Sequence, residues 1–284
     1  MPDLLPHIEK ISLVAFLVSS MLALGLTLTL PAIIAPLRDV RFVLLALGLN
    51  FIVAPAFAWL LTVVIPLDRG YAVGLLVLGG AAGAPFFPQV VEAARGDLAL
   101  AAALMSLLTL GTILFLPFAL PLMIPGLQAD PWNIARPLAL LILLPLCVGM
   151  LVKSRAATLA ARTAPLLGKI ANASLLLFFA LLIALNVRLL LGVLGSGAIL
   201  VALVFFAGLF VIGWLFGGPK PEVRGVLGLA TAGRNFGAAL VPAASSSSDP
   251  KVTIMIVVGA IVCLIVSFLA AGWVRRATLT PHAG

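Results

Sequence analysis

Charged residues are scarce in this sequence: Asp, Glu, Lys and Arg together make up 9% of its 284 residues. A soluble domain has about 25% charged residues, so the composition excludes an ordinary soluble fold. Hydrophobic residues make up 63%, and the mean hydropathy is +1.30. We therefore expect an all-α polytopic membrane protein whose principal partner is the lipid bilayer.

Other absences narrow the function. The two cysteines lie within apolar runs with no metal-ligand spacing, and the two histidines lie near the termini. There is no phosphate-binding loop and no pair of carboxylates inside an apolar segment, so we expect neither an ATPase nor any other enzyme, and no metal site. The net charge of +8 comes from basic residues in short loops, where they set orientation, and does not indicate nucleic-acid binding.

Hydropathy predicts nine membrane spans, since a span needs about 20 mostly apolar residues. The connections are short, so residues 1–284 are expected to form one membrane domain. Asp97, Asp130 and Asp249 are expected to cap the helices that follow them. The predicted spans are 11–30, 42–66, 71–92, 98–123, 132–152, 165–187, 196–217, 225–246 and 251–274.

The basic residues predict the orientation. With nine spans, five basic residues fall on the side of the N-terminus and eleven on the opposite side, while Arg234 is left inside the membrane. The side richer in Lys and Arg is cytoplasmic. We therefore expect the N-terminus outside and the C-terminus in the cytoplasm.

Two of the nine spans are interrupted by residues that break helices. The span 71–92 contains Pro85 and Pro88, which lack backbone N–H groups, and the span 225–246 contains Gly233 and Pro242. The second span also carries an arginine. Broken backbone at membrane depth is tolerated only where protein or a water-filled cavity surrounds it. Two interrupted spans in corresponding halves indicate the binding site of a transporter, so we expect them to cross at the membrane centre.

Several residues in or near these spans are candidates for binding a substrate or an ion. A hydrogen bond to a neighbouring helix explains Asn50 equally well, and Ser106 and Thr109 commonly bond to the carbonyls of their own helix. The candidates are Asn50, Pro85, Phe87, Pro88, Gln89, Ser106, Thr109, Thr231, Arg234 and Asn235.

Arg234 is the most informative candidate. It follows Val223 by 11 residues, which is about 16 Å of helix and about half the thickness of the hydrocarbon layer. A snorkelling side chain belongs nearer the interface. An arginine at the centre costs about 2.5–3.5 kcal/mol or more unless it has a partner, so we expect a buried functional position.

The order of several short motifs resembles the bile acid:sodium symporter family. They are Gly25-Leu-Thr-Leu28, Asn50-Phe-x-x-x-Pro55, Ala94-Arg-Gly-Asp97 and Arg234-Asn235-Phe-Gly237. The resemblance implies a secondary transporter in a bacterial-type inner membrane, built from two inverted repeats with two broken, crossing helices. The family's first helix is missing, which implies repeats of four and five spans, at about 11–123 and 132–276.

The positions that bind sodium in that family differ here. Asn50 keeps the family's chemistry, whereas the acidic residue shared by both ions is replaced by Ala230. Hard cations need oxygen ligands, so the sequence argues against sodium coupling. The resemblance assigns one ion to Phe87, Pro88, Ala101 and Met105, and the other to Asn50, Ala230, Thr231, Gly233 and Arg234.

These observations predict a sodium-independent carrier of a small organic anion, in which the guanidinium of Arg234 takes the place of one sodium ion. Two alternatives stay open: a sodium-coupled symporter of bile acid-like anions, and a sensor or receptor on the same fold. Arsenite export is disfavoured because residues 79–92 contain no thiol. We expect a monomer without a cofactor.

Overall fold

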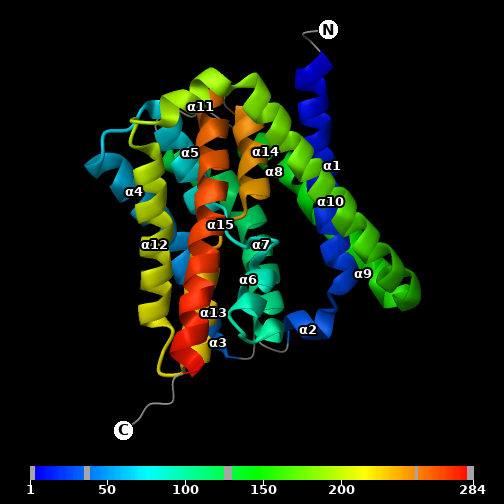
Figure 1. The fold of residues 1–284 in the computed structure, drawn as a ribbon. Coiled ribbons are helices and arrows are strands. Elements are labelled where there is room, and N and C mark those ends of the chain that lie inside the picture. The colour runs from blue at the N-terminus through cyan, green and yellow to red at the C-terminus, as the bar shows by residue number, and fades with distance from the viewer. Residues whose placement is uncertain (1–3, 35–38, 125–129, 247–248, 280–284) are drawn as a thin grey trace.

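The computed structural model describes residues 4–34, 39–124, 130–246 and 249–279 (Figure 1). These residues form helices and connecting segments, with one isolated bridge and no other strand pairing among them. Within the described ranges, seven helical segments are long and apolar enough to cross a membrane, which confirms a multi-pass membrane protein. They are α1 (Leu4–Thr27), α3–η2–α4 (Val40–Val64), α7 (Leu98–Met123), α8–η3–α9 (Pro131–Arg155), α10 (Ala157–Leu185), α12 (Ala198–Phe216) and α15 (Pro250–Leu279).

The other two predicted spans are each divided into two shorter helices. The first comprises α5 (Arg69–Gly80) and α6 (Phe87–Ala93), and the second comprises α13 (Pro221–Ala232) and α14 (Phe236–Ser246). The count of nine spans and their inverted repeat therefore stay predictions. Two short helices were not predicted as separate elements: α2 (Leu30–Ile34) and α11 (Val187–Val193).

Aspartates begin several of the helices, as predicted. The Asp97 carboxylate accepts hydrogen bonds from the backbone N–H groups of Ala99 and Leu100 at the start of α7. The predicted caps at Asp130 of α8 and Asp249 of α15 are also confirmed. Asp68 caps α5 as well, and Lys251 Nζ, 2.6 Å from Asp68 Oδ2, holds the pKa of that carboxylate below its ordinary value.

The helices form two groups. We call α1, α9 and α10 the outer layer, because α1 packs against both of the others and lies with them along one side of the bundle (Figure 1). Gly25 of α1 and Gly149 of α9 bring the two backbones together, since a Cβ on Gly25 would clash with the carbonyl of Leu146. In the main body, α12 packs against α13 and α15, and α15 packs against α5.

One span connects the outer layer to the main body. Its first part, α8 (Pro131–Leu138), packs against α7 and α14, whereas its last part, α9 (Leu144–Arg155), packs against α1 and α10. Between them lies the π-helix η3 (Ala139–Leu143), followed by Pro145. A π-helix and a proline both interrupt regular helical hydrogen bonding, so the change of partners coincides with an irregular stretch of the span.

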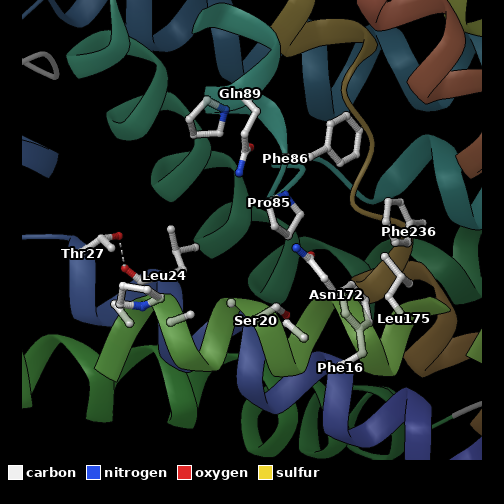
Figure 2. A pocket seen from close by; sticks show the side chains of 16 residues that line it. Phe16, Ser20, Leu24, Thr27, Pro85, Phe86, Gln89, Asn172, Leu175 and Phe236 are labelled. Atoms are coloured by element: carbon white, nitrogen blue, oxygen red, sulfur yellow. Dashed lines mark hydrogen bonds between the residues drawn. The ribbon is translucent and has the colours of Figure 1, made fainter. Parts of the chain in front are cut away.

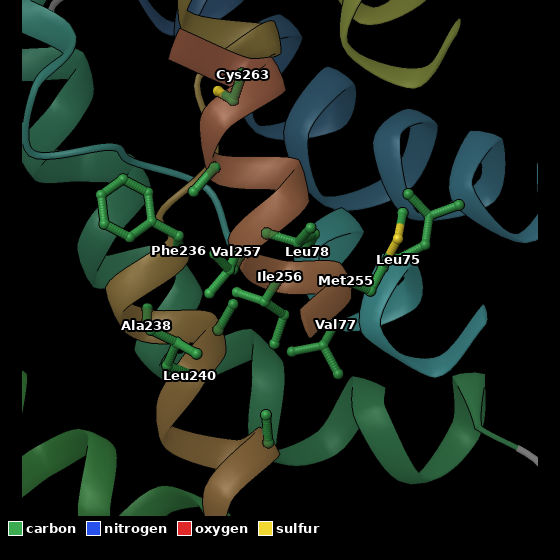
Figure 3. Packing of buried hydrophobic residues seen from close by; sticks show 14 of the residues in the cluster. Leu75, Val77, Leu78, Phe236, Ala238, Leu240, Met255, Ile256, Val257 and Cys263 are labelled. Atoms are coloured by element: carbon green, nitrogen blue, oxygen red, sulfur yellow. The ribbon is translucent and has the colours of Figure 1, made fainter. Parts of the chain in front are cut away.

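A cluster of buried apolar side chains runs through the main body, where Figure 3 shows part of it, and continues onto α1, α9 and α10 of the outer layer. Leu75 and Leu78 of α5 pack in this cluster with Met255 and Ile256 of α15, and Leu240 of α14 joins them. These side chains are almost fully buried. Because lipid tails are as apolar as these side chains, close packing and not removal from water holds the last turns of α5 and the first turns of α14 against α15.

Candidate functional site

Two extended segments cross inside the main body. Residues 81–86 connect α5 to α6, and residues 233–235 connect α13 to α14. Ala82 and Arg234 form an antiparallel bridge, and the backbone N–H of Asn235 donates to the carbonyl of Ala81 at 2.8 Å. The two interruptions predicted from prolines and glycines thus lie against one another, which the sequence could suggest but not demonstrate.

Two threonines of α7 hold the first extended segment. The Thr112 hydroxyl accepts from the backbone N–H of Ala82 at 2.8 Å and donates to the Ala82 carbonyl at 2.9 Å. The Thr109 hydroxyl donates to the Gly83 carbonyl at 3.0 Å. Sequence reasoning missed Thr112. Thr112 follows Thr109 by three residues, so both hydroxyls lie on the same face of the helix. This spacing could have identified Thr112 from the sequence.

Replacing Thr112 by valine is expected to destabilise the protein by about 2–6 kcal/mol. The shape is retained, but the buried N–H and carbonyl of Ala82 both lose their partner, and each unsatisfied group costs about 1–3 kcal/mol. Thr163→Val is the control, since that exposed hydroxyl bonds within its own helix, and its effect should stay within about 0.5 kcal/mol. Equal unfolding midpoints for the two purified variants would contradict the role given to Thr112.

Asn235 fastens the second extended segment to the first. Its Nδ2 donates to the Gly83 carbonyl at 3.0 Å, and its Oδ1 accepts from the backbone N–H of Ala238 at 2.9 Å. The second bond caps the start of α14. Gly83 has φ +82°, and a Cβ there would clash with the backbone N–H of Thr109, so only glycine fits this position.

The guanidinium of Arg234 lies at the centre of the crossing and is 1% exposed. Its Nη1 donates to the carbonyls of Gly79 at 3.3 Å and Asn50 at 3.5 Å. Its Nη2 donates to the Asn50 side-chain oxygen and to the Thr231 carbonyl. All these partners carry no formal charge, and within the described residues the buried Nε has no partner.

The backbone geometry explains why these carbonyl oxygens are free. Gly79 and Thr231 belong to the last turns of α5 and α13, where carbonyls have no partner within the helix. Asn50 lies in the π-helix η2 (Leu49–Val53), and Ala54 N–H bonds to Leu49 and not to Asn50. The next residue, Pro55, has no N–H to donate, so the Asn50 carbonyl is also left for the arginine.

The electrostatics of the crossing therefore favour a cation. The C-terminal ends of α5 and α13 converge on Arg234, and each helix end has a partial charge of about −0.5. The guanidinium supplies a positive charge and fixed N–H donors directed at these ends. The positive charge of Arg234 therefore lies where the two helix ends favour one.

The other candidates divide between the crossing and a neighbouring pocket. Thr109 and Asn235 contribute side chains to the crossing, whereas the Thr231 hydroxyl donates to Leu227 in its own helix and only its carbonyl meets Arg234. The Ser106 hydroxyl likewise donates to Ala102 in its own helix. The side chain of Phe87 is buried in an apolar cluster. Pro85, Pro88 and Gln89 line the pocket.

The pocket has a volume of about 490 Å³ and lies between the outer layer and the crossing (Figure 2). Phe236 closes one end of it, with ring centroids 5.9 Å from both Phe16 and Phe86. Sequence reasoning missed Asn172 of α10, whose side chain lines the wall that the outer layer forms. The sequence feature that could have identified Asn172 is an amide side chain inside a predicted span, here 165–187. The same feature made Asn50 a candidate.

A comparison with protein families decides the identity at family level. The model of the sodium bile acid symporter family matches residues 14–193, which is more than half of the chain. The chain belongs to the sodium bile acid symporter family. It is thus a membrane transporter by family, and the resemblance found in its motifs is confirmed. A search of curated proteins gave no significant match.

The matched region of this symporter-family chain includes only part of the site. It contains Asn50, the first extended segment and both helices that line the outer wall of the pocket. It ends before α13, so Arg234 and the second extended segment lie beyond it. The family match therefore assigns no role to Arg234.

Proposed function

We propose that this protein is a secondary transporter of a small organic anion that works by alternating access without sodium. The observation that carries the proposal is the guanidinium of Arg234, buried between the C-terminal ends of α5 and α13. In this proposal the arginine is a tethered cation that keeps the crossing in the arrangement that a bound ion would otherwise stabilise. Its fixed positive charge, beside the pocket, also favours a negatively charged substrate.

The surroundings of the crossing support independence from sodium. The resemblance places one ion among Phe87, Pro88, Ala101 and Met105. Pro88 lines the pocket, and the other three side chains are buried in a single apolar cluster. Ala230, where the family has its shared acidic residue, belongs to the same cluster. Apolar side chains offer no oxygen ligands to a hard cation. The coupling ion, if the substrate is moved uphill, is then a proton or a counter-transported anion.

We propose that each divided segment crosses the membrane as one discontinuous span, giving nine spans in two inverted repeats. The N-terminus is then outside a bacterial-type inner membrane and the C-terminus is in the cytoplasm. Broken backbone is permitted at that depth because protein surrounds it, and residues 81–84 and 233–235 are buried. A single chain carries both crossing segments and the pocket, which supports a monomer as the functional unit.

Alternating access requires two groups of helices that move relative to one another. The pocket lies between the outer layer and the crossing, so a displacement of the outer layer would change access to it. The span α8–η3–α9 changes partners at a π-helix followed by Pro145. We propose this junction as the point about which the outer layer moves, since π-helices commonly mark functional irregularities.

Uptake into reconstituted vesicles tests the proposed function. Protein-containing vesicles should accumulate a radiolabelled arylcarboxylate such as 4-biphenylacetate faster than protein-free vesicles, at the same rate in sodium and choline buffers of equal ionic strength. Uptake that strictly requires sodium would favour the sodium-coupled alternative and reject the tethered cation. The lost ion ligands also fit a receptor, and a receptor would bind the compound without exchanging it across the membrane.

A further inference from the structure

The pocket holds two amide side chains that are not used by the fold. Gln89 on α6 and Asn172 on α10 line it from opposite walls, and both side chains point into the space between them (Figure 2). The other polar side chains of the pocket are engaged on their own helix: the Ser20 hydroxyl donates to Leu17, and the Thr27 hydroxyl donates to Leu24. Within the described residues, no hydrogen bond involves either amide side chain.

The two amides belong to different groups of helices. Gln89 is on α6, which packs against α7, α13 and α15 of the main body. Asn172 is on α10, which packs against α1 in the outer layer. A ligand that bonds to both side chains therefore joins the two groups across the pocket. An amide inside an apolar span is costly at membrane depth unless it faces a cavity or a partner, which fits a binding role for Asn172.

The rest of the pocket limits the kind of ligand. Among its lining residues there is no Asp, Glu, Lys, Arg or His, and Phe16, Phe86 and Phe236 form its apolar end. Arg234 does not line the pocket, and its Nη donors already bond to oxygens of the crossing. A second negative charge at the phenyl end would be buried without a partner, which is strongly unfavourable.

We propose that Gln89 and Asn172 form a two-amide clamp for the head group of the substrate, and that the substrate is a monocarboxylate with an aromatic or other flat apolar body. Each amide presents two N–H donors, so the pair can bind the two oxygens of one carboxylate. The body then lies against the three phenyl rings, where aromatic pairs gain about 0.5–1.5 kcal/mol beyond burial. This inference rests on the proposed function, because it specifies the substrate of the same pocket.

Equilibrium binding to the purified full chain tests the clamp, with 4-biphenylacetate as the probe and biphenyl-4,4′-dicarboxylate as the dianion. The monocarboxylate is expected to bind at least tenfold more tightly than the dianion. Gln89→Leu and Asn172→Leu should each weaken its binding about tenfold or more, as expected for a lost bond to a charged group. Asn186→Leu is the control at the C-terminal end of α10, since the Asn186 side chain donates to the Leu182 carbonyl and does not line the pocket. This variant should bind the probe normally.

A double variant separates a shared clamp from two independent effects. If both amides bind one carboxylate, Gln89→Leu with Asn172→Leu should weaken binding by less than the product of the single effects, because the second loss acts on a site already broken. Fully multiplicative effects would overturn the clamp. Equal affinity for the dianion, or no binding of the monocarboxylate by the wild-type chain, would overturn the substrate class.

The outcomes for the clamp and for transport are distinguishable. If vesicles take up the probe and the leucine variants bind and transport normally, transport stands and the clamp is wrong. If the variants lose binding that the wild type shows, but wild-type vesicles show no uptake or exchange, the clamp stands and the protein is a receptor. Circular dichroism of each variant, unchanged from the wild type, separates lost binding from lost folding.

Discussion

Replacing Arg234 by methionine is expected to abolish transport and to cause the largest loss of stability of any single substitution at the crossing. Methionine fills much of the space but donates no hydrogen bond. The carbonyls of Gly79 and Thr231 and both oxygens of Asn50 would then lose their buried donor. Each orphaned acceptor costs about 1–3 kcal/mol, and the total approaches the whole stability of a typical domain, about 5–15 kcal/mol.

Two further variants separate the possible causes of this loss. The causes are the missing positive charge, the missing hydrogen-bond donors, and the removal of an arginine from this part of the chain in general. Arg224→Met is the matched control on α13, since that guanidinium donates to the Trp214 carbonyl at 3.1 Å and is only partly buried. It should remain folded and active. Arg234→Lys keeps the charge but has a single, differently shaped donor group, so we expect a folded protein with reduced uptake. Normal unfolding temperature and uptake for Arg234→Met would remove the tethered cation from the mechanism.

The sequence determined the general architecture because bilayer physics restricts it strongly. Span length, scarce charge and aspartate caps predicted the seven long helices, and α7 matches residues 98–123. Some boundaries were less accurate: α10 begins at 157, whereas its span was predicted from 165. The same reasoning located both interruptions, since Pro85 and Gly233 each disfavour a continuous helix at their position. These are local effects of backbone chemistry, and local effects can be read along a chain.

The contacts of the site depended on information that is not local. Arg234 was predicted as buried, but its partners come from residues 155 and 184 positions away in sequence. Thr112 and Asn172 resembled ordinary polar residues in apolar helices until α7 was placed beside Ala82 and α10 beside the pocket. The carbonyls that meet the guanidinium also carry no sequence signature, because every residue has one.

Exchanging the tethered cation for a carboxylate is expected to make the protein sodium-dependent. Ala230→Glu combined with Arg234→Gln removes the fixed positive charge and adds a buried negative one in the last turn of α13, the helix end that Arg234 contacts through the Thr231 carbonyl. The oxygens of Asn50, Gly79 and Thr231 are then free, and with the new carboxylate they supply oxygen ligands to a hard cation. Without a cation, the buried carboxylate is unpaired and destabilising.

The dependence can be measured as the unfolding temperature and the uptake rate of the double variant, in sodium against choline at constant ionic strength. Binding of sodium to the folded state alone should stabilise it by about 2.7 kcal/mol when sodium exceeds its dissociation constant a hundredfold. Ala230→Glu by itself is the decisive control. With Arg234 present, the new carboxylate finds an internal partner, so that variant should not respond to sodium. A double variant as indifferent to sodium as the wild type would mean that the guanidinium does not occupy a cation site, even if Arg234 is needed for folding.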